Sequence, residues 1–180
     1  MENKTPFMTE IPEQEPQRQQ YFMAHAKEQL HILEENLGRP LTCCINTFGC
    51  QMNARDSEKL SGILETIGYQ AVETEDADFV LYNTCTVREN ANLRVYGRLG
   101  QLGARKKKHP HMMIALCGCM MQEKEVVEKI KQTYRFVDLI FGTHNIFKLA
   151  ELVSLCLEER LEELEARGRE DKKPKHKMVV

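Results

Sequence analysis

The chain has 180 residues, of which 42% are hydrophobic and 29% charged, which is ordinary for a soluble globular protein with one well-formed core. Its formal net charge of −2 excludes proteins that bind nucleic acid through a strongly basic overall charge. No apolar run approaches the roughly 20 residues of a membrane span, and residues 1–20 contain no signal-peptide core. We therefore expect a cytoplasmic protein without a membrane partner.

The first 40 residues read as an extension that carries one helix. Residues 1–16 contain three prolines and few apolar positions, so we expect a mobile leader there. A helical pattern then runs from Gln17 to Asn36, and Gly38 and Pro40 end it. Its apolar stripe needs a partner, and the simplest prediction is that the helix packs on the following domain.

From residue 41 to 165, strand-like and helix-like patterns alternate. Strands are predicted at 41–47, 69–72, 77–83, 112–116 and 137–141. Helices are predicted at 54–67 with Asn53 as the cap, at 87–105, at 122–134, and to residue 164 with Thr143 or Asn145 as the cap. The alternation predicts an α/β domain: a Rossmann-like, open, mainly parallel sheet with helices on both faces, preceded by the N-terminal helix.

The last 15 residues differ from the domain. Residues 166–180 are mostly charged and offer nothing to bury, so we expect a linker. Met178, Val179 and Val180 look like the first residues of another strand. We therefore expect the chain to be a piece of a longer protein, with the linker leading toward a missing domain.

Seven cysteines without a secretion signal point to buried thiols, metal ligands or catalytic thiols and away from a disulfide framework. Cys50, Cys85 and Cys119 each follow an apolar run. They are therefore predicted at the carboxyl ends of three strands, where ligands bind in open parallel sheets. Three thiolates would leave one iron of a [4Fe–4S] cluster free to bind something else, which would be a functional feature.

The other four cysteines have simpler interpretations. Cys43 and Cys44 lie inside a predicted strand and Cys156 on an apolar helix, so all three read as buried small hydrophobes. Cys117 lies beside the predicted site but still on its strand. No C-x-x-C pair of the zinc-finger type occurs. From spacing alone, a three-cysteine metal site and ordinary buried cysteines both remain open.

Other site chemistry is sparse. The chain has no P-loop, no G-x-G-x-x-G after the first strand and no discernible Ser-His-Asp set, and we assign no catalytic residue. A basic loop at 105–109 would contact RNA phosphates or simply be solvated. Asn83, Arg88, Glu89 and Gln122 flank the cysteines and would orient a ligand or serve as caps and surface pairs.

Three motifs carry a resemblance to a known family. They are Asn46–Asn53 (NTFGCQMN), Asn83–Ala91 (NTCTVRENA) and Gly118–Gln122 (GCMMQ). In this order they resemble the three cysteine motifs in the N-terminal domain of the radical-SAM methylthiotransferases, and the match extends from about Thr42 to Leu152. The first motif is most similar to the branch that acts on N6-isopentenyladenosine at position 37 of tRNA.

The resemblance implies a site and its cofactors. Cys50, Cys85 and Cys119 would bind an auxiliary [4Fe–4S] cluster whose open iron holds the sulfur to be donated. A second [4Fe–4S] cluster in a central radical-SAM domain would cleave S-adenosylmethionine to a radical, and a second S-adenosylmethionine would methylate the sulfur. The substrate partner would be tRNA, held mainly by domains outside this chain. The sulfur source is not indicated.

The chain departs from the family pattern in one respect. It contains no C-x-x-x-C-x-x-C motif, which the second cluster requires. We therefore expect a fragment of a transferase that is able to carry the sulfur-donating cluster and unable to turn over alone. The alternatives are a branch that modifies threonylcarbamoyladenosine in tRNA or a ribosomal protein, a stand-alone iron–sulfur or tRNA-binding module, and zinc on the same thiolates.

Overall fold

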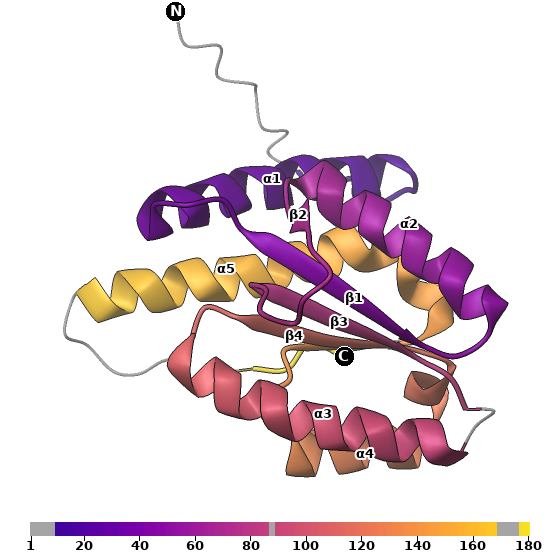
Figure 1. Cartoon of the computed structure of the whole chain (residues 1–180). Coiled ribbons are helices and arrows are strands. Elements are labelled where there is room, and N and C mark those ends of the chain that lie inside the picture. Colours follow the sequence, from indigo (N-terminus) through magenta and orange to yellow (C-terminus); the bar gives the residue numbers. More distant parts are fainter. Residues whose placement is uncertain (1–9, 87–88, 169–176) are drawn as a thin grey trace, which may run out of the picture.

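The protein is a three-layer α/β/α domain, seen in the computed structural model, which describes residues 10–86, 89–168 and 177–180 (Figure 1). The strands are β1 (Thr42–Phe48), β2 (Gln70–Ala71), β3 (Phe79–Thr84), β4 (Met113–Gly118) and β5 (Leu139–Phe141). The helices are α1 (Gln17–Leu37), α2 (Gln51–Ile67), α3 (Glu89–Lys108), α4 (Lys124–Thr133) and α5 (Leu149–Gly168), with 3₁₀ helices η1 (Cys119–Gln122) and η2 (Thr143–Lys148). These five strands form one parallel sheet in the order β2-β1-β3-β4-β5, which confirms the predicted fold class.

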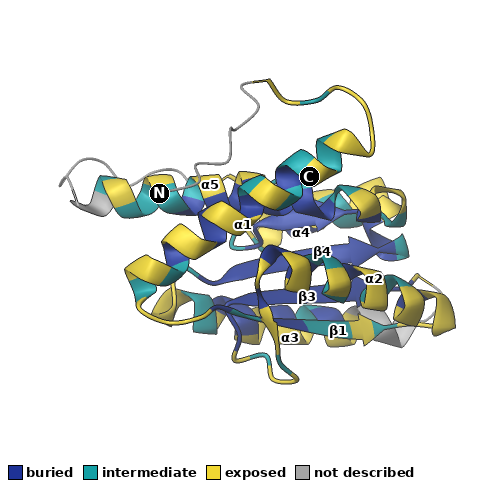
Figure 2. Cartoon of the chain, turned by 90° about the horizontal axis from the view of Figure 1, so that it is seen from above, coloured by how far each residue is buried: buried dark blue, intermediate teal, exposed yellow. Residues whose placement is uncertain are grey.

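Two apolar cores lie on the two faces of this sheet. Phe79 and Leu81 of β3 belong to the core under α1, α2 and α5. Val80 and Tyr82 belong to the core under α3 and α4. Because both faces are covered, every residue of β3 and β4 is buried, and Figure 2 shows the buried sheet between helices whose outer sides are exposed.

The N-terminal helix is an integral part of one layer. Helix α1 packs against α5 and α2 and contributes buried residues such as Phe22 and Leu30 to the core. It ends at Gly38, whose φ of 71° lies in the left-handed region. The predicted helix and its predicted stop are confirmed, whereas the first nine residues of the predicted leader lie outside the described residues.

Three predicted helix starts were wrong. Helix α2 begins at Gln51 with Cys50 as its N-cap, and Asn53 is a buried residue of the first turn. The helix predicted at 122–134 begins two residues later, at Lys124, because Gln122 is the last residue of η1. Helix α5 begins at Leu149 because η2 occupies the residues from Thr143 onward, so neither Thr143 nor Asn145 caps it.

The predicted basic loop at 105–109 is also wrong, because residues 105–108 form the last turn of α3. Basic side chains are favourable there, at the negative end of the helix dipole. The Lys106 side chain is moreover bonded within the protein. Its ammonium donates to the Phe136 carbonyl at 2.7 Å and to the Asp138 carboxylate at 2.6 Å. Only the remaining basic residues of this turn are available to solvent.

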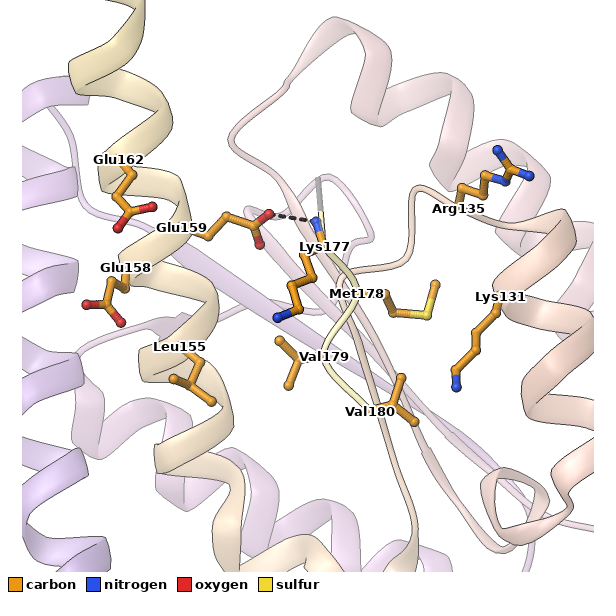
Figure 3. A pocket seen from close by; sticks show the side chains of 10 residues that line it. All are labelled: Lys131, Arg135, Leu155, Glu158, Glu159, Glu162, Lys177, Met178, Val179 and Val180. Carbon is orange, nitrogen blue, oxygen red and sulfur yellow. Dashed lines mark hydrogen bonds between the residues drawn. The ribbon is translucent and has the colours of Figure 1, made fainter. Parts of the chain in front are cut away.

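The C-terminal residues join the sheet next to β5. Val179 bridges Leu139 in parallel, and its N–H donates to the Asp138 carbonyl at 2.8 Å. Figure 3 shows this segment between α4 and α5, with the Lys177 N–H bonded to Glu159 at 2.7 Å. Of residues 178–180, which were predicted to begin a strand, Val179 alone forms such a bridge, and no strand is assigned to this described segment. Helix α5 continues to Gly168, past the predicted start of the linker, and residues 169–176 lie outside the described part of the chain.

The pocket beside this segment is lined by charged side chains and is separate from the three cysteine motifs. Basic Lys131 of α4 and Arg135, which follows that helix, line one side of it, and acidic Glu158 and Glu162 of α5 line the other (Figure 3). Its lining contains no cysteine. Among the described residues, no helix has the length and apolar character needed to cross a membrane.

Two buried aspartates hydrogen-bond neighbouring strands at the amino-terminal ends of the sheet strands. Asp78, just before β3, accepts the Thr42 N–H of β1 at 2.9 Å. Asp138, just before β5, accepts the Ile114 N–H of β4 at 2.7 Å. Each carboxylate therefore satisfies a strand-end donor on the neighbouring strand and also pairs with buried or half-buried cations.

Replacing Asp138 with Ala should strongly destabilise the fold. The change leaves the buried Lys106 and Arg160 cations and the Ile114 N–H without this carboxylate. Loss of one partner from such a buried network costs about 3–5 kcal/mol, measurable as a drop in the urea midpoint by circular dichroism. The matched control is Asp76→Ala, since the Asp76 side chain is 74% exposed and should shift the free energy of unfolding by at most about 0.5 kcal/mol. Equal effects of both changes would contradict this account.

The Asp78 carboxylate should make stability fall in acid. Burial alone would raise the pKa of Asp78, but hydrogen bonds from Arg39, His111 and the Thr42 N–H outweigh it and hold the pKa well below its usual range. The unfolded chain takes up a proton at Asp78 near pH ~3.9 whereas the native state does not, so stability is lost as pH falls below that value.

Urea unfolding at a series of pH values from 7 to about 3 tests this linkage. In Asp78→Asn the free energy of unfolding should fall less steeply between pH 5 and 3, because the titrating group is absent. Asp76→Asn, which removes an exposed carboxylate, is the control and should keep the original slope. Parallel curves for the chain and Asp78→Asn would show that Asp78 does not carry the acid sensitivity.

Candidate functional site

The three predicted cysteines lie at one edge of the sheet because β1, β3 and β4 end in register. Phe48 of β1 pairs with Thr84 of β3, and Thr84 pairs with Gly118 of β4. Cys85 and Cys119 directly follow the ends of β3 and β4, and Cys50 follows Phe48 by two residues. Parallel pairing thus brings three chain segments far apart in sequence to the same carboxyl-terminal edge, as predicted.

Two glycines allow the cysteine segments to approach closely. A Cβ on Gly118 would lie 2.1 Å from the Thr84 carbonyl oxygen, and the φ of 109° at this position also favours glycine. A Cβ on Gly49 would lie 2.9 Å from the Cβ of Cys85. The backbone before Cys50 and the backbone before Cys119 are therefore both in direct contact with the end of β3.

Cys50 is the exposed member of the set and the N-cap of α2. The pKa of its thiol is lowered, chiefly by the backbone N–H groups of Asn53 and Met52 and to a lesser extent by hydrogen bonding with the Cys85 thiol. Donors at a helix N-terminus stabilise a thiolate in the same way that they stabilise other anions. The helix N-terminus thus favours the thiolate form of Cys50.

Cys85 and Cys119 are less exposed. Cys85 is 3% exposed, and Cys119 is intermediate at the first position of η1. Burial raises the pKa of Cys119, and negative charge on Cys85 and then on Cys50 raises it further. The three thiols therefore interact electrostatically, although no three His, Cys, Asp or Glu side chains in the described ranges are grouped closely enough to hold a single metal ion.

The remaining cysteines lie where the sequence predicted. Cys43 and Cys44 of β1 and Cys156 of α5 are 1–3% exposed within the two cores. Cys117 is fully buried on β4, one register row behind the edge. Burial raises the pKa of the thiols of Cys43 to about 12 and of Cys117 and Cys156 further, so these groups are poor ligands.

Of the flanking polar residues, Gln122 and Asn83 have clear partners. The Gln122 amide donates to Thr143 Oγ1 at 2.7 Å and joins η1 to η2. Asn83 is buried and bonded to α2. Arg88 and the side chain of Glu89 lie outside the described residues. Asn53 was predicted only as a helix cap, and its burial in the site was missed because an asparagine before a helical pattern ordinarily reads as a cap.

The fold and this edge define a parallel α/β domain with three cysteines at the carboxyl ends of adjacent strands. The model of the family described as Uncharacterized protein family UPF0004 matches residues 42–142, which include Cys50, Cys85 and Cys119. The chain belongs to this family.

Named relatives are similar over most of this chain. A tRNA-2-methylthio-N(6)-dimethylallyladenosine synthase from Lachnoclostridium phytofermentans is 71% identical over 131 residues, which are 73% of this chain and 29% of the relative. Proteins with the same name from Acetivibrio thermocellus and Alkaliphilus oremlandii are 50% and 52% identical, over 83% and 73% of this chain and 32% and 29% of the relatives. The chain thus spans about a third of the length of these relatives, and the predicted resemblance to methylthiotransferases is confirmed.

Gly118→Ala should disrupt both the fold and the site, because the new Cβ would overlap the Thr84 carbonyl and force a strained φ. We expect a loss of about 3 kcal/mol or more in the free energy of unfolding, measured in urea. Gly100→Ala in α3 is the matched control: its Cβ meets nothing within 4 Å, and helix propensity should make that variant more stable by about 0.5–1 kcal/mol. A Gly118→Ala protein of unchanged stability would refute the close approach.

Proposed function

We propose that this chain is the part of a tRNA methylthiotransferase that holds the sulfur-donating auxiliary [4Fe–4S] cluster on Cys50, Cys85 and Cys119. The observation that carries the proposal is the convergence of these three cysteines at one edge of the sheet, whereas the other four cysteines lie inside strands or on α5. The relatives' printed name, a 2-methylthio-adenosine synthase acting on tRNA, supplies the reaction class.

The donor set fits such a cluster. Thiolates are the usual ligands of iron–sulfur clusters, and a cluster held by three of them keeps one iron open. A zinc ion on the same thiolates would instead leave the protein colourless. When bound, the cluster would supply sulfur for insertion into the substrate.

Each ligand residue has a distinct part in this proposal. Cys50, with its lowered pKa and exposed position, is the ligand that a cluster meets from solvent. Cys85 and Cys119 extend from strand ends whose register is fixed, so they hold the inner side of the cluster. Buried Met120 and Met121 line the apolar core behind Cys119 and exclude water from that side.

The whole reaction belongs to a longer protein in this proposal. S-adenosylmethionine and a second [4Fe–4S] cluster would be bound outside the chain, since it contains no C-x-x-x-C-x-x-C motif. The substrate, an N6-isopentenyladenosine beside the anticodon of tRNA, would reach the carboxyl-terminal edge of the sheet. The reaction is expected in the cytoplasm.

Anaerobic reconstitution with iron and sulfide tests the ligand assignment. The intact chain should take up about four iron and four sulfide and show the broad visible absorbance of a [4Fe–4S] cluster. Cys50→Ala, Cys85→Ala and Cys119→Ala should each lose most of it, because two thiolates do not hold the cluster stably. Cys43→Ala and Cys156→Ala, which remove thiols buried in the core, are the controls and should retain it. A colourless zinc-loaded chain, or equal loading of all five variants, would overturn the proposal.

A further inference from the structure

A pair of buried asparagine side chains ties the Cys50 turn to the end of β3. Asn53 in the first turn of α2 is 2% exposed, and Asn83 of β3 is fully buried. The Asn53 amide nitrogen donates to Asn83 Oδ1 at 3.1 Å, and the Asn83 amide nitrogen donates to the Asn53 backbone carbonyl at 2.8 Å. Both residues lie within the cysteine motifs, and neither is among the proposed cluster ligands.

The orientation of the Asn53 amide is fixed by its partners. Its nitrogen also faces the Thr84 carbonyl at 3.1 Å, which only accepts hydrogen bonds. Its oxygen must therefore face the other way, where it accepts the Cys50 N–H at 3.2 Å. All four hydrogen-bonding positions of this amide are used, since the Cys50 thiol lies 3.3 Å from the same oxygen.

The pair connects the two ligand segments beyond the last ladder pair of β1 and β3, which is Phe48 with Thr84. Cys50 precedes α2, whereas Cys85 follows Thr84, and the Asn53 amide bonds to both the Cys50 and the Thr84 backbone. Asn83 adds a second tie to α2 through Ser57 Oγ at 3.0 Å. A buried amide that loses a hydrogen-bond partner costs free energy, because its polar group is left without a partner away from water. The Cys50 turn therefore has little freedom to move away from β3.

We propose that Asn53 and Asn83 are positioning residues that set the separation of Cys50 from Cys85 through this amide pair. In this way they make the exposed thiol of Cys50 meet the same ligand as the buried thiol of Cys85. The consequence for cluster binding rests on the proposed function, whereas the geometric statement about the two thiols does not.

Thiol crosslinking of the reduced, metal-free chain tests the geometry. Dibromobimane, a short bifunctional thiol reagent, should join Cys50 to Cys85, and the joined peptides are quantified by mass spectrometry. In Asn53→Ala the crosslinking rate should fall by about tenfold, the factor equivalent to one lost buried hydrogen bond. Asn46→Ala is the matched control, because the Asn46 amide of the same motif bonds instead to Glu75 at 2.7 Å; its rate should not change.

A second readout separates positioning from general destabilisation. Labelling of the core thiols Cys43 and Cys156 by a monofunctional reagent should stay slow in Asn53→Ala, because the core is intact. Crosslinking at the original rate in a folded Asn53→Ala chain would overturn the proposal, as would a fall matched by faster labelling of the core thiols. If Asn53→Ala does not fold, Ser57→Ala decides the matter. It removes the outer tie together with a hydroxyl hydrogen bond to Thr47, so Thr47→Val is its control, and an unchanged crosslinking rate in Ser57→Ala would equally overturn the proposal.

Iron loading distinguishes this proposal from the proposed function. If the intact chain takes up the cluster and Asn53→Ala takes up substantially less, the amide pair positions the ligands for it. Failure of the intact chain to load would overturn the proposed function and leave the crosslinking result valid. Full loading of Asn53→Ala would show that the pair does not set ligand geometry for the cluster.

Discussion

The close approach of Gly118 to Thr84 is the constraint on which the cysteine-bearing edge depends. A side chain at Gly118 would occupy the position of the Thr84 backbone, so the ends of β3 and β4 meet without an intervening group. Thr84 reinforces the contact by donating its hydroxyl to the Cys117 carbonyl at 2.7 Å, while its own carbonyl accepts the Asn53 amide. One residue at the end of β3 is therefore bonded to both neighbouring ligand segments, and the placement of Cys50 and Cys119 relative to Cys85 follows from it.

The fold was predictable because its signals are long and repeated. Five apolar runs separated by helical patterns left few arrangements other than a parallel sheet covered on both faces. The predicted starts of the helices were wrong where no apolar residue marks the first turn. The first two turns of α2, before Leu60, bury only Asn53, so periodicity gave no sign that the helix starts at Gln51. Likewise, the polar residues around Thr143 suited a cap, whereas the structure uses them in a 3₁₀ turn ahead of α5.

The sequence predicted the three cysteines at the strand ends, but it did not predict the residues that hold these strand ends together. An apolar run followed by a cysteine is visible in sequence, and register then brings Cys50, Cys85 and Cys119 to one edge. The roles of Asn53 and Asn83 depend on contacts between residues 30 positions apart, which no local pattern encodes. The same holds for Asp78 and Asp138, whose carboxylates satisfy donors on neighbouring strands at the opposite edge.

These aspartates also bear on how the chain reaches its native state. Asp78 closes the β1-α2-β3 unit onto Thr42 over 36 residues, and Asp138 closes the β4-α4-β5 unit onto Ile114 over 24 residues. The free-energy costs of closing the two loops differ by only about 0.4 kcal/mol, so chain entropy does not favour the formation of either unit before the other. Cys50 and Cys85 belong to the first unit and Cys119 to the second. Only after β3 and β4 join does the folding chain present all three thiols together, so the proposed cluster would be held only once these two units have paired.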